Sequence, residues 1–234
     1  MFLSDLQTAI TKKLFDSGIE TSSLDSRIIL KEVFCFDEKE LILNSQLIVP
    51  DNKINEVDKI LSRRVSGEPV SKIFGKRDFY KSTFLISKDV LDPRPETELI
   101  IEIANNFILD KGYKNFIDLG TGSGCIILSI LKDNKNLSAL GIDISNKAIN
   151  IAQKNCSNLN LENQATFLVS NWLSKVSGSY DLIISNPPYI PSKDIDTLLD
   201  NVKNYDPLIS LDGGDDGLKC YREIAEDINR IISK

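Results

Sequence analysis

Four consecutive residues, Asn186-Pro187-Pro188-Tyr189, carry groups that can hold a planar nitrogen. Proline fixes its φ angle and lacks an N–H group, so the carbonyl oxygens of the segment stay free to accept hydrogen bonds. The side-chain oxygen of Asn186 is a further acceptor, and the ring of Tyr189 can cover a flat group. Two acceptors aimed at one NH2 group stabilise the positive charge that develops as its nitrogen attacks an electrophile. The segment therefore predicts chemistry at an amide-like or aromatic amine nitrogen, and a rigid proline turn without a ligand is the alternative.

A glycine-rich segment, Asp118-Leu-Gly-Thr-Gly-Ser-Gly124, has the composition of a nucleotide-binding loop. It follows a predicted strand and opens a predicted helix, which is the context that such a loop requires. Glycine lets the backbone turn sharply close to a ligand, and the helix start presents free N–H groups. The spacing G-x-G-x-G differs from the G-x-G-x-x-G of dinucleotide enzymes, but the loop alone does not decide which nucleotide binds. The candidate cofactor contacts are Asp118, Gly120, Thr121, Gly122, Ser123 and Gly124.

Two more candidates lie at or just after the ends of the next two predicted strands. Asp143 lies 19 residues after Gly124, at the end of the next predicted strand. A carboxylate at that place can accept hydrogen bonds from both hydroxyls of a ribose. Trp172, the only tryptophan, comes directly after a strand, where a ligand contact and ordinary core packing are equally supported.

The order of predicted elements places all of these residues at one edge of a sheet. Strands and helices alternate after Pro95, which favours a parallel, doubly wound α/β sheet whose ligands bind at the carboxyl ends of the strands. Strands are predicted over 115–119, 138–143, 166–170 and 180–185, and helices over 96–110, 123–131, 145–156, 194–202 and 218–232.

The first part of the chain has a different pattern. Residues 1–72 predict short helices that must pack together as a small bundle, one of them capped by Asp51 after Pro50. Residues 73–92 are rich in aromatic and β-branched residues with a polar interruption at Lys81-Ser82, which predicts a β-hairpin joining the bundle to the rest. The expected organisation is a helical docking domain over 1–72, a hairpin linker over 73–92 and a cofactor-binding domain over 93–234.

Composition excludes several kinds of chemistry. The 234 residues include no histidine, which excludes Ser-His and Cys-His mechanisms and His-ligated metal sites. The net charge of −6 argues against binding nucleic acid through bulk electrostatics. The four cysteines are scattered and the N-terminus does not look like a signal peptide, so we expect buried or half-buried free thiols, a cytoplasmic location and no membrane contact.

With these motifs together, the chain resembles the bacterial peptide chain release factor N5-glutamine methyltransferases along essentially its whole length. Further matching segments are Gly67-Glu-Pro-Val70 with Phe74-Gly75, Pro93-Arg-Pro-Glu-Thr-Glu98, Asp206-Pro207, Leu211-Asp-Gly-Gly214 and Asp216-Gly-Leu218 with Tyr221. DNA adenine methyltransferases share the Asn-Pro-Pro-Tyr motif but not this set.

The resemblance implies a Rossmann-like class I methyltransferase that uses S-adenosylmethionine and gives S-adenosylhomocysteine. It implies that Gly120, Gly122, Gly124, Asp143 and Trp172 contact the cofactor, with Asn186 as a further candidate. The implied substrate is the glutamine of the Gly-Gly-Gln motif in class 1 release factors, with its amide held by Asn186 to Tyr189. We expect Asn186, Pro187 and Tyr189 to be catalytic, the enzyme to be a monomer, and no direct binding of nucleic acid.

Other interpretations remain open from the sequence. The same chemistry could act on a ribosomal protein glutamine or on adenine N6 of nucleic acid, and a binding module without turnover is a third possibility. Arg94 and Glu96 suit a structural role and substrate contact equally, and Asp212, Asp215 and Asp216 suggest an acidic turn rather than a calcium loop. The family continues into further strands after the last helix, whereas this sequence stops at Lys234. We therefore expect an exposed sheet edge and an incomplete core.

Overall fold

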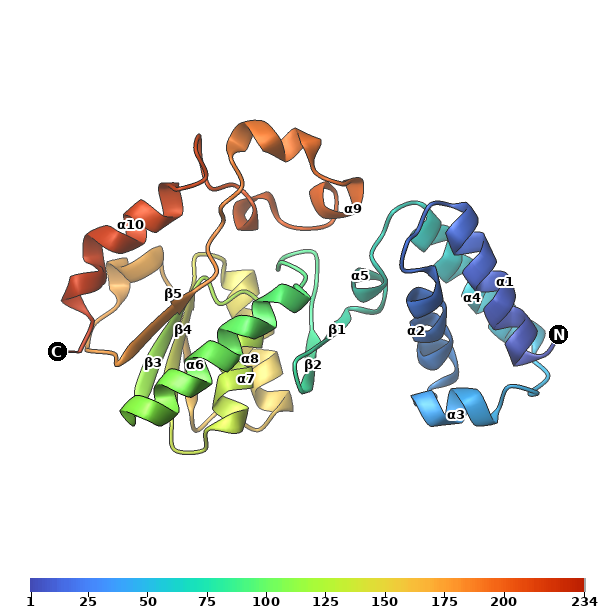
Figure 1. Ribbon diagram of the computed structural model, residues 1–234, viewed down its shortest axis with the longest axis horizontal. Coiled ribbons are helices and arrows are strands. Elements are labelled where there is room, and N and C mark those ends of the chain that lie inside the picture. The colour runs from blue at the N-terminus through green and yellow to red at the C-terminus, as the bar shows by residue number, and fades with distance from the viewer. Residues whose placement is uncertain (234) are drawn as a thin grey trace. The chain divides into compact units, whose positions relative to one another are not determined.

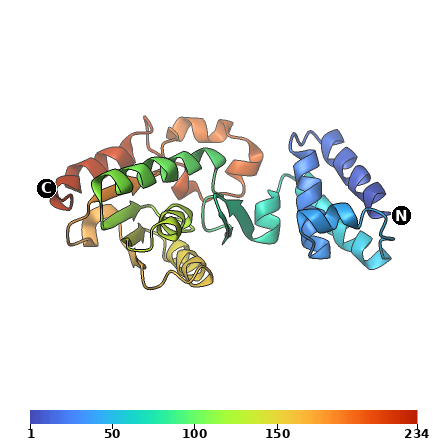
Figure 2. The same ribbon diagram turned by 60° about the horizontal axis from the view of Figure 1, so that its bottom comes forward.

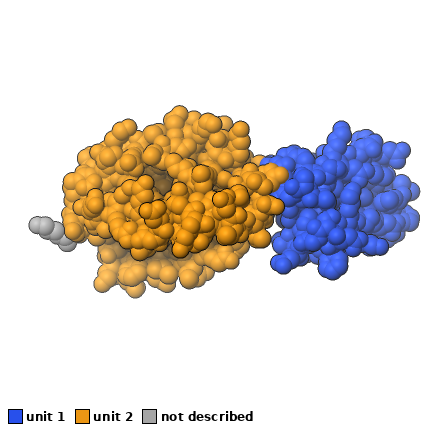
Figure 3. Space-filling model, turned by 90° about the horizontal axis from the view of Figure 1, so that it is seen from above, with its two compact units in different colours: residues 1–74 blue, residues 75–234 orange. Residues whose placement is uncertain are grey.

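The computed structural model describes residues 1–233 and divides them into two compact units (Figure 3). The first unit is Met1–Phe74 and the second begins at Gly75. Each unit has its own hydrophobic core.

The first unit is a bundle of short helices. Its core takes Leu6, Ile10 and Leu14 from the first helix, as the apolar spacing predicts. A buried ion pair between Arg64 Nε and Asp25 Oδ2, 2.7 Å apart, joins the second helix to the fourth. The helices are α1 (Leu3–Asp16), α2 (Ser22–Phe34), α3 (Glu38–Leu43), α4 (Asp51–Val65) and α5 (Val70–Phe74).

One predicted helix start is wrong by a residue. Pro50 is the N-cap of α4, and Asp51 is already its first helical residue. Proline fits this position because its φ of −64° continues the extended chain, while Asp51 places a negative charge in the first turn, where the helix dipole favours it. The helices α3 and α5 are too short for a periodic pattern to predict.

The predicted hairpin is present and packs into the second unit. Strands β1 (Lys76–Phe79) and β2 (Ser82–Leu85) pair antiparallel. Phe79 and Phe84 are buried in the core of the second unit, with ring centroids 6.2 Å apart in an edge-to-face arrangement.

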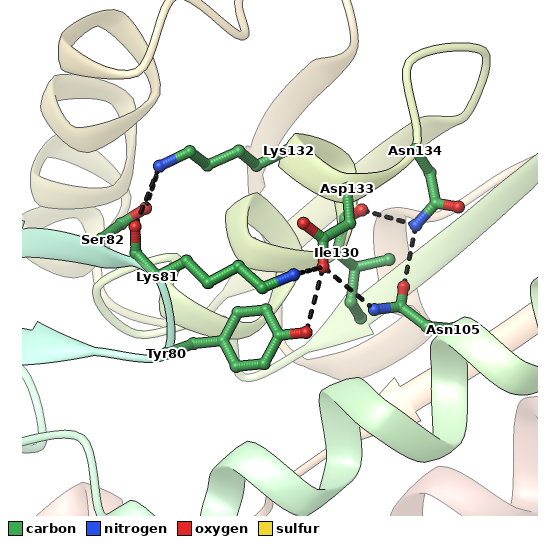
Figure 4. Close-up of polar contacts among 8 residues, drawn as sticks. All are labelled: Tyr80, Lys81, Ser82, Asn105, Ile130, Lys132, Asp133 and Asn134. Atoms are coloured by element: carbon green, nitrogen blue, oxygen red, sulfur yellow. Dashed lines mark hydrogen bonds and ion pairs between the residues drawn. The ribbon is translucent and has the colours of Figure 1, made fainter.

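A polar cluster also ties the hairpin turn to its own unit (Figure 4). Asp133 Oδ2 accepts hydrogen bonds from the Tyr80 hydroxyl at 3.0 Å, from Lys81 Nζ at 2.7 Å and from Asn105 Nδ2 at 3.4 Å. This carboxylate raises the pKa of Lys81. The turn is therefore held by the Asp133 carboxylate, which Asn105 also contacts, as well as by the aromatic core.

The second unit is a parallel α/β sheet in the order β5-β4-β3-β6. Its strands are β3 (Asn115–Leu119), β4 (Ser138–Asp143), β5 (Ala165–Val169) and β6 (Leu182–Ser185). Its helices are α6 (Glu98–Lys111), α7 (Cys125–Asp133), α8 (Asn146–Asn158), α9 (Asp200–Lys203) and α10 (Lys219–Asp227).

Alternate residues of the strands face two different cores. Phe116 of β3 packs with α6, α7 and α8 on one face, whereas Ile117 packs with α10 and the short helix Trp172–Lys175 on the other. Figures 1 and 2 show α8 and α10 on opposite sides of the sheet. The sheet is covered on both faces, as the alternating order of elements predicts.

Some surfaces of the second unit are open within residues 1–233. Strand β6 pairs only with β3, and the exposed face of α6 carries Leu99, Ile103 and Phe107. None of the helices in this range is long and apolar enough to cross a membrane. Cys125, Cys156 and Cys220 are buried free thiols, but Cys35 is exposed, so the expectation of burial is wrong for that residue.

Candidate active site

A cavity of about 650 Å³ lies where the four strands of the parallel sheet end. Its wall includes Gly120 and Gly122 after β3, Asp143 at the end of β4 and Trp172 after β5. The residues after β6 contribute as well. Loops from neighbouring parallel strands converge at this edge, so residues far apart in sequence share one space.

The three glycines of the loop serve two different purposes. Gly120 and Gly122 have φ angles of +75° and +56°, which side chains rarely adopt, and both face the cavity. Gly124 is buried beneath it, where a Cβ atom would lie 3.1 Å from Leu128 Cδ1 and 3.2 Å from Ala152 Cβ. Thus two glycines give access to a ligand, and the third permits close packing of α7 on α8.

Three other loop residues lie below the cavity surface. Asp118, Thr121 and Ser123 are buried and do not line the cavity. Asp118 Oδ2 accepts a hydrogen bond from Thr121 Oγ1 at 2.7 Å, whereas Oδ1 has no partner within the described chain. Burial raises the pKa of Asp118 to about 7. The carboxyl group thus supports the loop from below.

Asp143 lines the cavity and also shapes the glycine loop. Its Oδ2 accepts the Gly122 N–H at 2.9 Å, and its Oδ1 accepts the Ser145 N–H at 2.8 Å. Burial raises the pKa of Asp143, although these backbone donors oppose the shift. A carboxylate has about four lone-pair sites, so both oxygens can still accept from a ligand.

Trp172 is held against the glycine loop. Its Nε1 donates to Glu223 Oε2 of α10 at 2.7 Å, and its ring lies 3.6 Å from where a Cβ on Gly120 would be. Its φ of +40° is unusual for a non-glycine residue, and the Trp172 carbonyl accepts a hydrogen bond from Ser170 Oγ. The indole packs beside the core and also lines the cavity, so its core packing is confirmed and its contact with a ligand stays a prediction.

The Asn-Pro-Pro-Tyr segment presents its groups in different directions. Asn186 and Pro188 line the cavity, Pro187 is buried and Tyr189 is exposed. Within residues 1–233 no group forms a hydrogen bond with the Asn186 side chain or with the carbonyl oxygen of Pro187. The Asn186 side chain, which belongs to the cavity wall, is therefore available to a ligand, whereas Pro187 lies behind that wall.

The cavity is also lined by two segments that the sequence patterns did not identify as part of a site. One is Asp89–Leu91, after the hairpin, and the other is Pro207–Ser210 with Asp212. The second belongs to a family-like motif, but its composition did not indicate a function. Glu223 was missed too, because a glutamate on an amphipathic helix looks like an ordinary solvent-exposed residue.

Several polar residues whose role the sequence did not decide form ion pairs within the second unit or are exposed. Arg94 Nη2 pairs with Asp206 Oδ2 at 2.6 Å, both in the second unit, and Glu96 is exposed. Asp216 pairs with Arg222, which together with a backbone donor lowers the pKa of this aspartate to about 2. In the described part of the chain no cluster of side chains suits a metal ion.

Comparisons with known proteins cover both units. The family described as "Methyltransferase small domain" matches residues 79–202, and the "PrmC N-terminal domain" matches residues 5–75. The release factor glutamine methyltransferase of Caulobacter vibrioides is 38% identical over 96% of this chain and 78% of its own length. That of Agrobacterium fabrum is 36% identical, over 96% and 79%.

One of the solved structures that match is a catalytic domain of low sequence identity. The catalytic domain of hMettl16, in complex with an RNA hairpin, is 18% identical and has a TM-score of 0.49, covering 74% of this chain and 61% of that one.

The cavity has the chemistry that S-adenosylmethionine, the cofactor of these methyltransferases, requires. Its volume is within the range of ligand sites, and bare glycine backbone, an acceptor carboxylate and an indole face it together. The Asn186 side chain adds an unpartnered polar group at the same wall. With relatives of this similarity across nearly its whole length, the chain belongs to the release factor glutamine methyltransferase family of S-adenosylmethionine-dependent enzymes.

Proposed function

We propose that this chain methylates the side-chain amide N5 of the glutamine in the Gly-Gly-Gln motif of class 1 peptide chain release factors. S-Adenosylmethionine is consumed and S-adenosylhomocysteine is formed. The observation that carries the proposal is that Asn186, whose side chain has no hydrogen-bond partner within residues 1–233, lines the same cavity as Gly120 and Gly122. The names of the relatives support the choice of substrate.

At the cofactor end, each contact has a separate task. Gly120 and Gly122 allow the ligand to approach the backbone, and Asp143 accepts hydrogen bonds from ribose hydroxyls. The Trp172 indole offers a flat apolar wall. The bound cofactor supplies a methyl group that is already activated for transfer, so no histidine is needed to generate a nucleophile.

At the target end, the protein must make an amide nitrogen reactive. The amide lone pair is delocalised, so the nitrogen becomes nucleophilic only as it loses planarity. The side-chain oxygen of Asn186 and the carbonyl of Pro187 accept its two N–H bonds, and they bind the positively charged, pyramidal nitrogen more strongly than the planar one. The same contacts fix the direction of attack.

The surface around Tyr189 supports a protein substrate. Tyr189 is 59% exposed, and Leu208, Ile209 and Leu218 are exposed in the segments that lie beside it. Exposed apolar side chains at the entrance of a polar site are typical of protein recognition. A nucleic-acid substrate would instead require a positive surface, and the chain has a net charge of −6.

A labelling assay tests the proposal. The full chain and radiolabelled S-adenosylmethionine are incubated together in three separate mixtures, which contain a release factor, a ribosomal protein or DNA. We expect label in the release factor and none after its Gly-Gly-Gln glutamine is replaced by alanine. Label in DNA alone, or persisting in the replaced release factor, would contradict the proposal.

Asn186→Ala tests the role of the acceptor. We expect kcat to fall by about 100- to 1000-fold, the range seen when one such group is removed, while the calorimetric Kd for S-adenosylmethionine changes little. Asn106→Ala, at an exposed position on α6, is the matched control and should leave both values unchanged. Equal losses in kcat and affinity for Asn186→Ala would show that this residue acts on the cofactor and not on the amide.

A further inference from the structure

The late segment, Asp206–Leu218, connects the cofactor cavity to the target end of the site. It runs between α9 and α10 (Figure 1). Pro207–Ser210 and Asp212 line the cavity, and the residues that follow turn back beneath Tyr189. One stretch of backbone therefore contacts both halves of the site.

Backbone hydrogen bonds join the late segment to the residues after Tyr189. Ile190 N–H donates to the Leu211 carbonyl at 3.0 Å, and Gly213 N–H donates to the Ile190 carbonyl at 2.8 Å. Ser192 extends the pairing: its N–H donates to the Gly214 carbonyl at 2.9 Å and its hydroxyl to Asp212 Oδ1 at 2.7 Å. This short parallel pairing fixes the direction in which the chain leaves Tyr189.

Two glycines let the segments approach closely. A Cβ on Gly213 would lie 2.7 Å from Tyr189 Cα and 2.8 Å from the Gly217 carbonyl oxygen. A Cβ on Gly217, whose φ is +77°, would overlap the carbonyl oxygen of Tyr189. Both glycines are buried, and the atoms that they meet are backbone, so the neighbours have little freedom to move aside.

The other end of the late segment is anchored as well. Asp206 Oδ2 pairs with Arg94, and its Oδ1 accepts the Asp92 N–H at 3.1 Å. The Asp206 side chain is only 2% exposed. The segment is thus held at both ends, and a displacement at Gly213 is passed to Tyr189 more easily than to Arg94.

We propose that Gly213 and Gly217 are positioning residues for methyl transfer, which set the backbone of Tyr189 and hence the carbonyls and ring that receive the target amide. The inference rests on the proposed function of the Asn-Pro-Pro-Tyr segment. A side chain at either glycine displaces Tyr189 while leaving Gly120, Gly122 and Asp143 in place.

Gly213→Ala is the decisive variant, because Gly213 does not have a positive φ and the change adds only volume. We expect kcat for methyl transfer to a release factor to fall about 10- to 100-fold, since small misplacements of reacting groups have effects of this size. The KM for S-adenosylmethionine should change much less than kcat, because Gly120, Gly122 and Asp143 keep their places and only Asp212 beside Gly213 lines the cavity. Hydrogen exchange at the Ile190 and Ser192 amides should become faster, because their acceptors move.

Gly178→Ala is the matched control. Its φ is +97°, but nothing lies within 4 Å of a Cβ there, so it tests backbone strain without contact. It should leave kcat and the exchange of Ile190 and Ser192 unchanged. Ser192→Ala removes one hydrogen bond without adding volume, so it gives a milder loss of kcat if Gly213→Ala fails to fold.

Normal kcat and normal amide exchange in Gly213→Ala would overturn the inference, and so would a loss in Gly178→Ala of equal size. The exchange measurement needs no substrate. If the wild-type chain does not methylate a release factor, the proposed function fails, while unchanged exchange at Ile190 and Ser192 would still refute the positioning by Gly213.

Discussion

Asp118 combines two demands at a single residue. Its carboxyl group is fully buried below the glycine loop. One of its oxygens accepts a hydrogen bond from the Thr121 hydroxyl, and the other has no partner within the described chain. A neutral carboxyl group tolerates such burial much better than a carboxylate. The protonation of this residue therefore affects how firmly the loop is held.

The pH dependence of stability can be derived from its pKa. The pKa rises from 3.8 to about 7 on folding, so the folded protein binds a proton that the unfolded chain has released. The stabilisation is complete below about pH 4 and is lost as the pH rises through about 7. Asp118→Asn does not titrate, so its free energy of unfolding relative to wild type should rise by about 2–4 kcal/mol between these pH values. Urea unfolding of both proteins without cofactor measures this, and parallel curves at all pH values would contradict it.

Much of the site at this scale could be predicted from the sequence. Gly120, Gly122 and Asn186 follow a strand and Asp143 ends one, and parallel strands bring such residues to one edge. Glu223 could not be predicted, because its bond to Trp172 joins positions far apart that no periodic pattern connects. The burial of Asp118, Thr121 and Ser123 also depends on packing beneath the loop and not on the loop's composition.

Among the elements, the hairpin is attached to the second unit by apolar contacts along its strands and by polar contacts at its turn. Its aromatic side chains enter the core of the second unit, while its turn is held by the Asp133 cluster at the surface. The pattern of aromatic residues predicts the hairpin. Its attachment to α6 and α7 could not be predicted, because Asp133 and Asn105 are ordinary polar residues at their helical positions.

Phe84→Ala tests the apolar part. Phe84 is fully buried, so the change should lower the free energy of unfolding by about 3–5 kcal/mol through lost transfer energy and a cavity. Chemical denaturation followed by circular dichroism measures the loss.

Asp133→Ala is the comparison for the polar part. Lys81 is exposed and its ion pair is screened by water, so this change should cost much less than Phe84→Ala. Its effect should shrink further as salt is added. A loss as large as that of Phe84→Ala would show that the polar cluster, and not the aromatic core, holds the hairpin.

At the scale of the whole molecule, the buried apolar residues of the two units form separate clusters. Met1–Phe74 encloses one around Leu14, and the second unit encloses another around the sheet. The sequence predicts two domains joined by a linking hairpin, whereas the compact units meet at Phe74 and Gly75 and the hairpin belongs to the second. The hydrophobic pattern cannot show which core the hairpin joins, because that depends on contacts of Phe79 and Phe84 with residues far along the chain.

Two core substitutions in the full chain test whether the units unfold independently. Leu14 and Phe116 are both fully buried, one in each core. Leu14→Ala should speed hydrogen exchange in α1, α2 and α4 and leave β3 and β4 protected, and Phe116→Ala should do the reverse. Exchange that rises throughout the chain for either variant would show a single cooperative unit.

The position of Trp172 allows ligand binding to be followed by intrinsic tryptophan fluorescence. It is the only tryptophan of the chain, its indole N–H is bound to a carboxylate, and its ring faces the cofactor cavity. Fluorescence excited at the red edge of the absorption band, where the six tyrosines contribute little, therefore comes from the cavity wall alone. A nucleoside placed against the ring would quench or shift this emission, so ligand occupancy can be followed in unlabelled protein, in real time and without turnover.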